Sequence, residues 1–407
     1  MPNAPEFRRT LVAVWIANFL TAMGLMSMVP WLTYVVEDLG VTEPAARNLW
    51  SGALVGIAPV LAAFMGPIWG SIGDRHGRRR MVLRALLAVT LTTGGMSFAR
   101  SPWLLLFLRV GQGLFSGFVP ASMSYVSAMA AAERQSRVAA GLQTAMPAGQ
   151  CLGFVLGGEL VSRFGMSAIF PFCSALGALG FLIILVAAPV DVVVDRGSTE
   201  EKGTRGFFGR LVQDTRDLAR FEGMPALLTG IFLIRAFTAA ADPLYARFVE
   251  TLGGDPRGAG RILGSQAVSL LLGMLFWGRV GDRRPSAFVL MTAGLGLGLT
   301  LLAHGFVGSI ASLYVLRAGS GFFIAGIYPA AYGMAGRASR PDRRGHAIGV
   351  VFFCFALAQA LGAFASGGMV NLFGFRRLFL ASGLLVILGG NLPVLRRLSG
   401  TRSGSRG

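Results

Sequence analysis

The sequence predicts an all-α membrane protein with twelve transmembrane helices in two pseudo-symmetric six-helix bundles. Three observations predict this fold: a surplus of apolar residues, twelve apolar runs of membrane-spanning length, and an internal repeat. Of the 407 residues, 54% are hydrophobic and only 14% are charged, whereas a soluble protein has about a quarter charged residues. The surplus apolar surface therefore needs lipid as its solvent.

The predicted helices follow from the lengths of the apolar runs. A membrane-spanning helix needs about 20 mostly apolar residues. Helices are expected because lipid cannot satisfy open backbone groups and the runs are too long for barrel strands. The runs are 11–34, 49–69, 81–98, 103–128, 138–161 and 168–190 in the first half, then 225–248, 261–277, 287–306, 310–336, 347–372 and 378–395.

The positive charges predict the orientation. With the N-terminus inside, the termini and the loops on that side hold 26 of the 37 Lys and Arg residues, and the opposite loops hold eight. This bias places both termini in the cytoplasm, and we expect a multi-pass protein of the bacterial inner (plasma) membrane. The net charge of +18 sits in short loops between apolar runs, so it favours contact with membrane lipids and excludes a nucleic-acid groove.

The longest polar stretch, residues 191–223, divides the chain into domains. We expect a six-helix bundle at 1–190, a cytoplasmic linker at 191–223, and a second six-helix bundle with a short cytoplasmic tail at 224–407. Apolar residues recur at helical spacing within the linker, which predicts an amphipathic helix on the inner membrane face. A tether between two bundles is favoured over a regulatory site.

The two halves of the chain are copies of one another. Both copies begin on the cytoplasmic side, so they are parallel repeats, the arrangement of transporters whose halves rock around a site at the membrane midplane. The matched segments are 69–75 with 277–283, 109–113 with 317–321, 164–165 with 373–374, and 36–40 with 249–253. In the first two pairs the second segment lies 208 residues after the first, and in the third pair it lies 209 residues after it.

The loop between the second and third runs carries a family signature. The segment Gly70-Ser-Ile-Gly73-Asp74-Arg75-His76-Gly77-Arg78-Arg79-Arg80 resembles motif A of the major facilitator superfamily. Its glycines permit close helix approach and a left-handed turn. The resemblance implies a gating latch between the halves on the cytoplasmic side; a plain positive turn is the alternative. The implied gating residues are Gly70, Gly73, Asp74, Arg75, Gly77, Arg78 and Arg79.

The resemblance extends over essentially the whole chain, with much of it in residues 49–84. Within the superfamily the chain looks nearest the drug:proton antiporter group, in particular MdtG-like multidrug exporters. This likeness implies the superfamily's fold and proton-coupled efflux of small amphipathic compounds, drugs or secondary metabolites, by alternating access. The alternatives are a nutrient symporter or facilitator, a siderophore or natural-product exporter, and, least favoured, a non-transporting membrane sensor.

Arg109 lies inside the fourth run. An arginine at mid-helix costs about 2.5–3.5 kcal/mol on insertion scales, so it must face the protein interior or a wet cavity. The segment Arg109-Val-Gly-Gln-Gly113 resembles the superfamily's motif B, whose arginine is linked to proton coupling. A structural hub that bonds backbone carbonyls is an equal alternative. For Arg317, the repeat mate of Arg109, the structural role is favoured.

The seventh run contains two charged residues, Arg235 and Asp242. Their spacing of seven places them on one helix face, about 10.5 Å apart along the axis. Asp242 is the only carboxylate well inside a predicted span, and an intramembrane carboxylate can take up and release a proton. We hypothesise that Asp242 couples protons or recognises a cation and is tuned by Arg235 or Arg109. A simply solvated acid is the alternative.

The fifth run is rich in glycine. Gly149, Gly153, Gly157 and Gly158 resemble motif C, a signature of exporters in the superfamily, although Phe154 stands where that pattern has proline. The resemblance therefore favours export. Small residues at every fourth position also form a ridge for close helix packing, whatever the direction of transport.

A substrate cavity between the halves would have apolar and aromatic walls with a few polar groups. His304 is expected to be a satisfied core residue. The chain has no phosphate-binding glycine loop and no histidine pair with metal-ligand spacing, so we expect no cofactor, no metal and no enzymatic activity. The expected partners are a small-molecule substrate, protons and lipids, and the protein is expected to be a monomer. The cavity candidates are Asn18, Trp31, Gln112, Tyr125, Gln143, Gln266, Tyr328, Tyr332 and Gln359.

Overall fold

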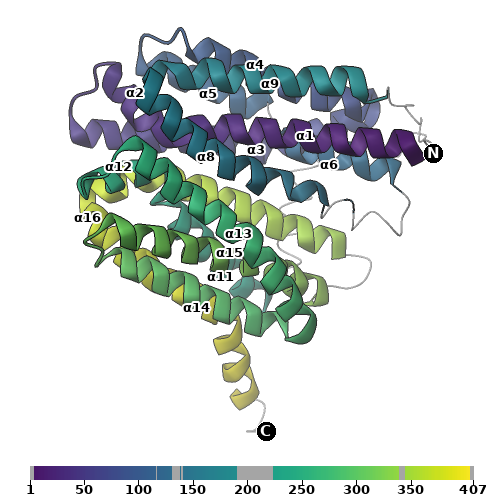
Figure 1. Ribbon diagram of the computed structural model, residues 1–407. Coiled ribbons are helices and arrows are strands. Elements are labelled where there is room, and N and C mark those ends of the chain that lie inside the picture. The colour runs from purple at the N-terminus through teal and green to yellow at the C-terminus, as the bar shows by residue number, and fades with distance from the viewer. Residues whose placement is uncertain are drawn as a thin grey trace. The chain divides into compact units, whose positions relative to one another are not determined.

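The computed structural model describes residues 4–115, 117–130, 138, 141–189, 223–338 and 344–403, and the regular elements in these ranges are all helices (Figure 1). The all-α fold predicted from the sequence is therefore confirmed. The predicted amphipathic helix in the linker lies outside the described residues. By internal contacts the chain divides into a first unit, Met1–Glu201 with Asp255–Gly264, and a second unit, Lys202–Gly254 with Ser265–Gly407.

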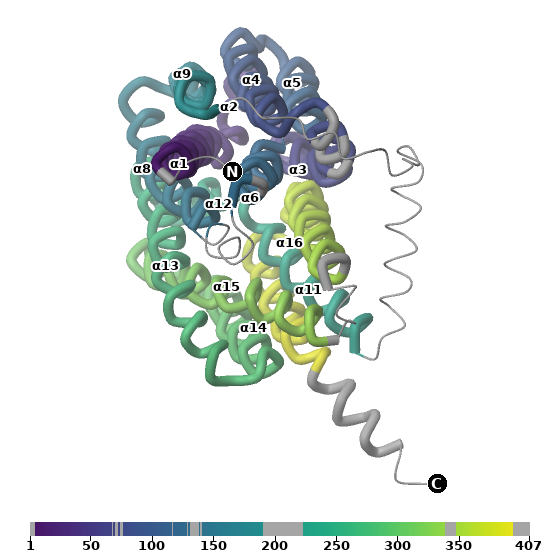
Figure 2. Tube along the Cα trace, turned by 90° about the vertical axis from the view of Figure 1, so that its right-hand side faces the viewer, coloured from purple at the N-terminus to yellow at the C-terminus, as the bar shows by residue number. Residues whose placement is uncertain are grey.

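The first unit contains a helix interrupted at Pro30 and a second interruption at Gly117. Gly117 adopts φ +103°, a conformation that ends the regular helix where the sequence predicted a continuous span over 103–128. The elements are α1 (Ala4–Met28), η1 (Val29–Trp31), α2 (Leu32–Asp38), α3 (Pro44–His76), α4 (Arg78–Met96), α5 (Pro102–Phe115), α6 (Phe118–Met129), α8 (Ala145–Phe164), η3 (Met166–Ala168) and α9 (Ile169–Ala187). Helix α1 packs against both α8 and α9 (Figures 1 and 2).

The second unit repeats this pattern. Its first helix is also interrupted at a proline, Pro243, and its last helical stretch is kinked at Gly374, which has φ +70°. The elements are α11 (Met224–Ala239), η4 (Asp242–Leu244), α12 (Tyr245–Thr251), α13 (Pro256–Arg283, of which the start up to Gly264 is grouped with the first unit), α14 (Ser286–His304), α15 (Ile310–Ala338) and α16 (Arg344–Ser403). Helix α16 packs against α11 and α14, and α14 packs against α15 (Figure 2).

All twelve predicted spans coincide with helices in the described ranges. Nine helical stretches there are long and apolar enough to cross a membrane, and one of them, Ala347–Pro393, contains both of the last two predicted spans. The predicted spans 81–98 and 138–161 correspond to α4 and α8, which are outside those nine. Helix α4 begins with three arginines, which lowers its average apolar character.

The internal repeat is present in individual contacts. In the first unit the Trp69 indole Nε1 donates a hydrogen bond to the Leu114 carbonyl at 2.7 Å. In the second unit Trp277 makes the same bond to the Phe322 carbonyl at 2.8 Å. Both partners are displaced by 208 residues, as the sequence predicted for this part of the repeat.

The repeat also extends to the packing of glycines. A side chain at Gly153 would collide with the Met23 carbonyl, and one at Gly362 would collide with the Ala236 carbonyl. Gly362 on α16 lies 209 residues after Gly153 on α8, and Ala236 on α11 lies 213 residues after Met23 on α1. The first helix of each unit therefore packs in the same register, which relates positions on α1 and α8 to those on α11 and α16.

Candidate functional site

Among the arginines whose burial the structure describes, three are buried within the helices. Arg109 and Arg317 are 3% exposed, and Arg235 is 5% exposed. A buried charge is stable only when polar groups surround it. The three guanidinium groups therefore mark where the interior is polar, and their partners differ.

Arg109 bonds neutral groups. Its Nε donates to the Leu54 carbonyl at 2.7 Å and its Nη2 reaches the Val55 carbonyl at 3.4 Å, both on α3. Its Nη1 donates to the side-chain oxygen of Gln112 on its own helix. These contacts have the geometry of the structural hub considered from the sequence. A role of Arg109 in proton coupling stays a prediction.

Arg317 on α15 forms an ion pair with Asp242. The Arg317 Nη2 and the Asp242 Oδ1 are 2.6 Å apart, and the carboxylate side chain is 37% exposed although the arginine is buried. The sequence predicts that Arg235 or Arg109 tunes Asp242. The direct partner is instead Arg317, the repeat counterpart of Arg109, for which the sequence favoured a structural role.

Two further side chains support this ion pair. The Arg317 guanidinium carbon lies 4.0 Å from the centre of the Tyr245 ring, and the Tyr245 hydroxyl is 3.1 Å from His304 Nε2. The His304 Nδ1 lies 2.7 Å from the Thr300 carbonyl. A carbonyl only accepts, so Nδ1 carries the proton and Nε2 accepts from the Tyr245 hydroxyl.

We call these four residues, Asp242, Arg317, Tyr245 and His304, the Asp242 network. His304 is buried and both of its ring nitrogens have hydrogen-bond partners, as expected of a core residue. It is also part of this network, because it accepts the hydrogen bond of the Tyr245 hydroxyl. Sequence reasoning missed Tyr245 altogether. Its position three residues after Asp242 could have suggested it, since residues three apart share a helix face.

The Asp242 network is not repeated at the equivalent positions of the first unit, all of which the structure describes. The repeat relates Asp242, Tyr245 and His304 to Val29, Leu32 and Met96, which are apolar. Only Arg317 has a like partner, Arg109. Apolar side chains therefore pack at these positions in the first unit, and the common fold does not require polar groups there. The network is an addition specific to the second unit.

The third buried arginine brings together several predicted cavity residues. The Arg235 Nη2 donates to Gln359 Oε1 at 2.5 Å, and its guanidinium carbon lies 5.5 Å from the Tyr328 ring centre. The Phe355 ring lies 4.7 Å from Tyr328 and 5.9 Å from Tyr332, centre to centre. We call these five residues the Arg235 cluster. Phe355 was not among the residues predicted from the sequence.

The other cavity candidates are dispersed. Asn18 accepts a hydrogen bond from Ser122 at 3.0 Å, and Gln112 is the partner of Arg109. Trp31 and Tyr125 are fully buried, and the Tyr125 hydroxyl donates to the Pro189 carbonyl at 2.7 Å. Gln143 is exposed and Gln266 is half-buried. A role for these residues in substrate binding stays a prediction.

The motif A segment forms the junction of α3 and α4. Gly77 has φ +101° and lies between the two helices, and a side chain at Gly73 would meet Met81 at 2.9 Å. The Arg79 Nη2 donates to the Leu185 carbonyl on α9 at 2.7 Å. The described geometry does not include the side chains of Asp74 and Arg75. The latch that the resemblance implies stays a prediction.

The motif C glycines bring α8 against α1. Side chains at Gly149, Gly153 and Gly157 would collide with backbone carbonyls of α1, at Phe19, Met23 and Ser27 in turn. The close-packing ridge expected from their spacing is therefore present. A link between this ridge and the direction of transport stays a prediction.

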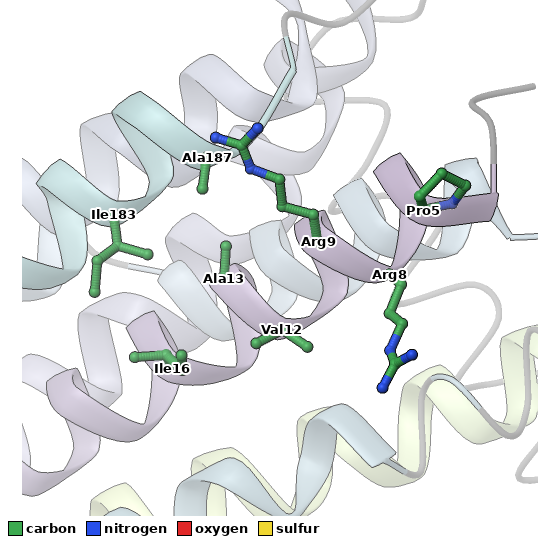
Figure 3. Close-up of a pocket in the computed structure, with 8 residues that line it drawn as sticks. All are labelled: Pro5, Arg8, Arg9, Val12, Ala13, Ile16, Ile183 and Ala187. Carbon is green, nitrogen blue, oxygen red and sulfur yellow. The ribbon is translucent and has the colours of Figure 1, made fainter.

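A groove of about 680 Å³ runs between α1 and α9 (Figure 3). Arg8, Val12, Ala13 and Ile16 are among the residues that line it from α1, and the Arg9 side chain extends toward Ala187 on α9. None of the predicted cavity residues borders this groove. It has apolar walls and a basic end, unlike the polar clusters described above.

Comparison with known proteins decides the family. The family model of the Major Facilitator Superfamily matches residues 14–240 and 227–406. The chain belongs to the major facilitator superfamily. It is therefore a multi-pass membrane transporter of small molecules, as its apolar helices and internal repeat predicted.

Relatives of this superfamily member include efflux pumps. It is 26% identical over 387 residues to the "Multi-drug resistance efflux pump PmrA homolog" of Lactococcus lactis (94% of this chain, 93% of that one). It is 27% identical over 398 residues to the "Multidrug resistance protein MdtG" of Dickeya zeae, with the same coverage.

Solved structures support the fold. The mutant nucleoside transporter NupG matches with a TM-score of 0.78 at 14% identity, over 95% of this chain and 99% of that one. A D-xylose-proton symporter matches with a TM-score of 0.72 at 15% identity, over 94% of this chain and 96% of that one. At these identities the likeness concerns the fold alone.

Proposed function

We propose that the protein exports small amphipathic compounds, drugs or secondary metabolites, in exchange for protons and by alternating access. The observation that carries the proposal is the ion pair between Asp242 and Arg317, a half-exposed carboxylate on a buried guanidinium. The relatives named as multidrug efflux proteins support the direction of transport.

The asymmetry of the ion pair suits proton coupling. The half-exposed Asp242 carboxylate is within reach of water and can exchange a proton with it, whereas Arg317 is buried. Protonation of Asp242 removes the anion and leaves the Arg317 cation without its counter-charge, which is unfavourable in a low-dielectric interior. Proton uptake therefore favours a rearrangement of the helices that hold the two residues, α15 and the η4 turn.

A proton gradient can supply the energy. Each elementary charge that crosses 100 mV yields about 2.3 kcal/mol, which sustains a useful concentration ratio of substrate. The transporter would work as a monomer in the bacterial inner membrane, with both termini in the cytoplasm, lipids around it, and no cofactor or nucleic acid. Among the alternatives, nutrient uptake is not favoured, because the relatives that match over most of the chain carry the names of efflux pumps.

The test is substrate-induced proton release from everted membrane vesicles that hold the protein and an imposed proton gradient. A panel of lipophilic cations, organic anions and neutral drugs is added, and the internal pH and the accumulated compound are both measured. Asp242→Asn is expected to lower proton-driven accumulation at least tenfold at normal expression, because the amide cannot carry the proton.

Asp255→Asn is the matched control. Asp255 is an exposed acid whose Oδ1 accepts from the Gly258 amide at 2.8 Å at the start of α13. Asparagine caps helices about as well as aspartate, so this variant should transport normally. Full proton-driven efflux by Asp242→Asn would remove Asp242 from the mechanism. If no compound of the panel moves protons, while a sugar added to the same vesicles equilibrates across the membrane, the export proposal fails.

A further inference from the structure

The second unit contains a buried cation, Arg235, that pairs with no carboxylate among the residues that the structure describes. Arg235 is 5% exposed, its observed partners are the Gln359 amide oxygen and the Tyr328 ring, and its Nε atom is buried with no hydrogen-bond partner. Asp242, the acid seven residues along, is bonded to Arg317 instead. A desolvated cation with only neutral partners is unfavourable, so the site has unused capacity for an anion.

The first unit indicates that this charge is not needed for folding. The packing register relates Arg235 to Ala22 and Gln359 to Gln150. The equivalents of Tyr328 and Tyr332 are Pro120 and Ser124, so both the aromatic rings and the guanidinium are absent there. The same helix packing forms around a methyl group at position 22, which is fully buried. Arg235 and its rings are therefore an addition to the common fold.

The Arg235 cluster is only partly buried. Gln359 is exposed and Tyr328 and Tyr332 are half-buried, whereas Arg235 and Phe355 are buried. A guanidinium presents a planar fork of donors that matches a carboxylate in two parallel hydrogen bonds. Neighbouring aromatic rings offer faces for another ring, which prefers offset or edge contacts. The cluster thus combines an anion-binding group with an aromatic platform.

We propose that the Arg235 cluster binds an aromatic organic anion, with its carboxylate on Arg235 and its ring against Tyr328 and Tyr332. The ligand oxygens take the place of Gln359 on Nη2 and supply the partner that Nε lacks. This inference names a substrate class for the site. It depends on the proposed function only for the step in which the bound compound is exported.

The test compares two fluorescent compounds of the same shape, 9-anthracenecarboxylate and its neutral amide, 9-anthracenecarboxamide. Equilibrium binding to the purified full-length protein in detergent is measured by the change in their fluorescence. The wild type is expected to bind the carboxylate at least tenfold more tightly than the amide, because hydrogen bonds between charged groups are stronger than those to a neutral group. Arg235→Gln should reduce this preference to within twofold, and Arg235→Lys should retain part of it.

Arg377→Gln is the matched control, because Arg377 is exposed on α16, and it should leave both affinities unchanged. Tyr328→Leu keeps the charge and removes a ring, so it should weaken both compounds severalfold and by equal factors. If Arg235→Gln does not fold to a stable protein, the Tyr328→Leu result decides. Equal affinity of the wild type for the two compounds, binding of neither, or an unchanged preference in Arg235→Gln would overturn the proposal.

The binding measurement needs no proton gradient, so the two proposals fail separately. A wild-type preference for the carboxylate without efflux in vesicles would keep the site and reject the export function. Proton-coupled efflux of other compounds without this preference would keep the export function and reject the site.

Discussion

At the scale of single residues, the two units differ at positions where one has ionisable groups and the other has apolar ones. Asp242, Tyr245 and His304 stand where the first unit has Val29, Leu32 and Met96. Each polar group in this network depends on the next, because a buried donor or acceptor without a partner loses its hydrogen bonds to water and gains no other hydrogen bond. The arrangement of Arg317 therefore depends on residues that it does not bond directly.

Tyr245→Phe tests this dependence. The variant keeps the aromatic ring next to Arg317 and removes the hydroxyl from which His304 Nε2 accepts a hydrogen bond. An unsatisfied buried acceptor costs about 1–3 kcal/mol, so the midpoint of thermal unfolding should fall measurably. Tyr314→Phe, at a half-buried tyrosine in the same unit, should change the midpoint far less. Equal midpoints for the two variants would show that the bond to His304 contributes nothing.

At the scale of elements, close packing of helices in both units depends on glycine. On α8 the glycines at every fourth position place the helix directly on the α1 backbone, and on α16 Gly362 does the same against α11. Contacts of this kind replace the hydrophobic effect, which does not drive association between helices in lipid. The interruptions at Pro30 and Pro243 give the first helix of each unit the same shape.

Gly153→Ala and Gly362→Ala are expected to destabilise the protein similarly. In each, the new methyl group would collide with a backbone carbonyl that cannot move like a flexible side chain, and such overpacking costs about 1–3 kcal/mol. The readout is the yield of monodisperse protein and its unfolding midpoint in detergent.

Gly349→Ala is the control for both variants. Gly349 is an exposed glycine of α16 with open space around its Cα. Alanine there should be neutral or stabilise by about 0.5–1 kcal/mol, since glycine weakens helices. A loss of yield equal to that of Gly153→Ala would mean that helix α16 rejects any substitution, and the close-approach explanation would fail.

At the scale of the whole molecule, charge and hydropathy specify how the chain enters the membrane. Of the 37 Lys and Arg residues, 26 belong to the termini and the loops expected in the cytoplasm. Such a bias orients membrane proteins because basic loops resist translocation. The apolar helices themselves carry no such direction.

The orientation can be measured with fusions to the C-terminus. A green fluorescent protein fused there should fluoresce, because it folds in the cytoplasm, and alkaline phosphatase should be inactive because it needs the periplasm. The reverse pattern would place the C-terminus outside. The same reporters fused after residue 254, in a loop expected outside, provide the internal control and should give opposite signals.

Much of the fold could be predicted because its determinants are local. Each of the twelve spans is set by a run of apolar residues, and the repeat is visible as matching segments. The break at Gly117 was missed because glycine is also common inside membrane helices. In the candidate site, the buried arginines were identified individually, but the pairing of Asp242 with Arg317 joins residues 75 positions apart, and Phe355 carries no sequence signal of its own.

Composition and the internal repeat are enough to identify a two-repeat helical membrane protein and to predict a bias of its Lys and Arg residues toward one side, because lipid and water partition residues by their chemistry. Which of the charged groups pair with one another is visible only in the folded protein. The faces that helices turn toward one another depend on the packing of all their side chains, so Arg317 rather than Arg235 bonds Asp242. For the same reason Arg235 is left among neutral and aromatic partners.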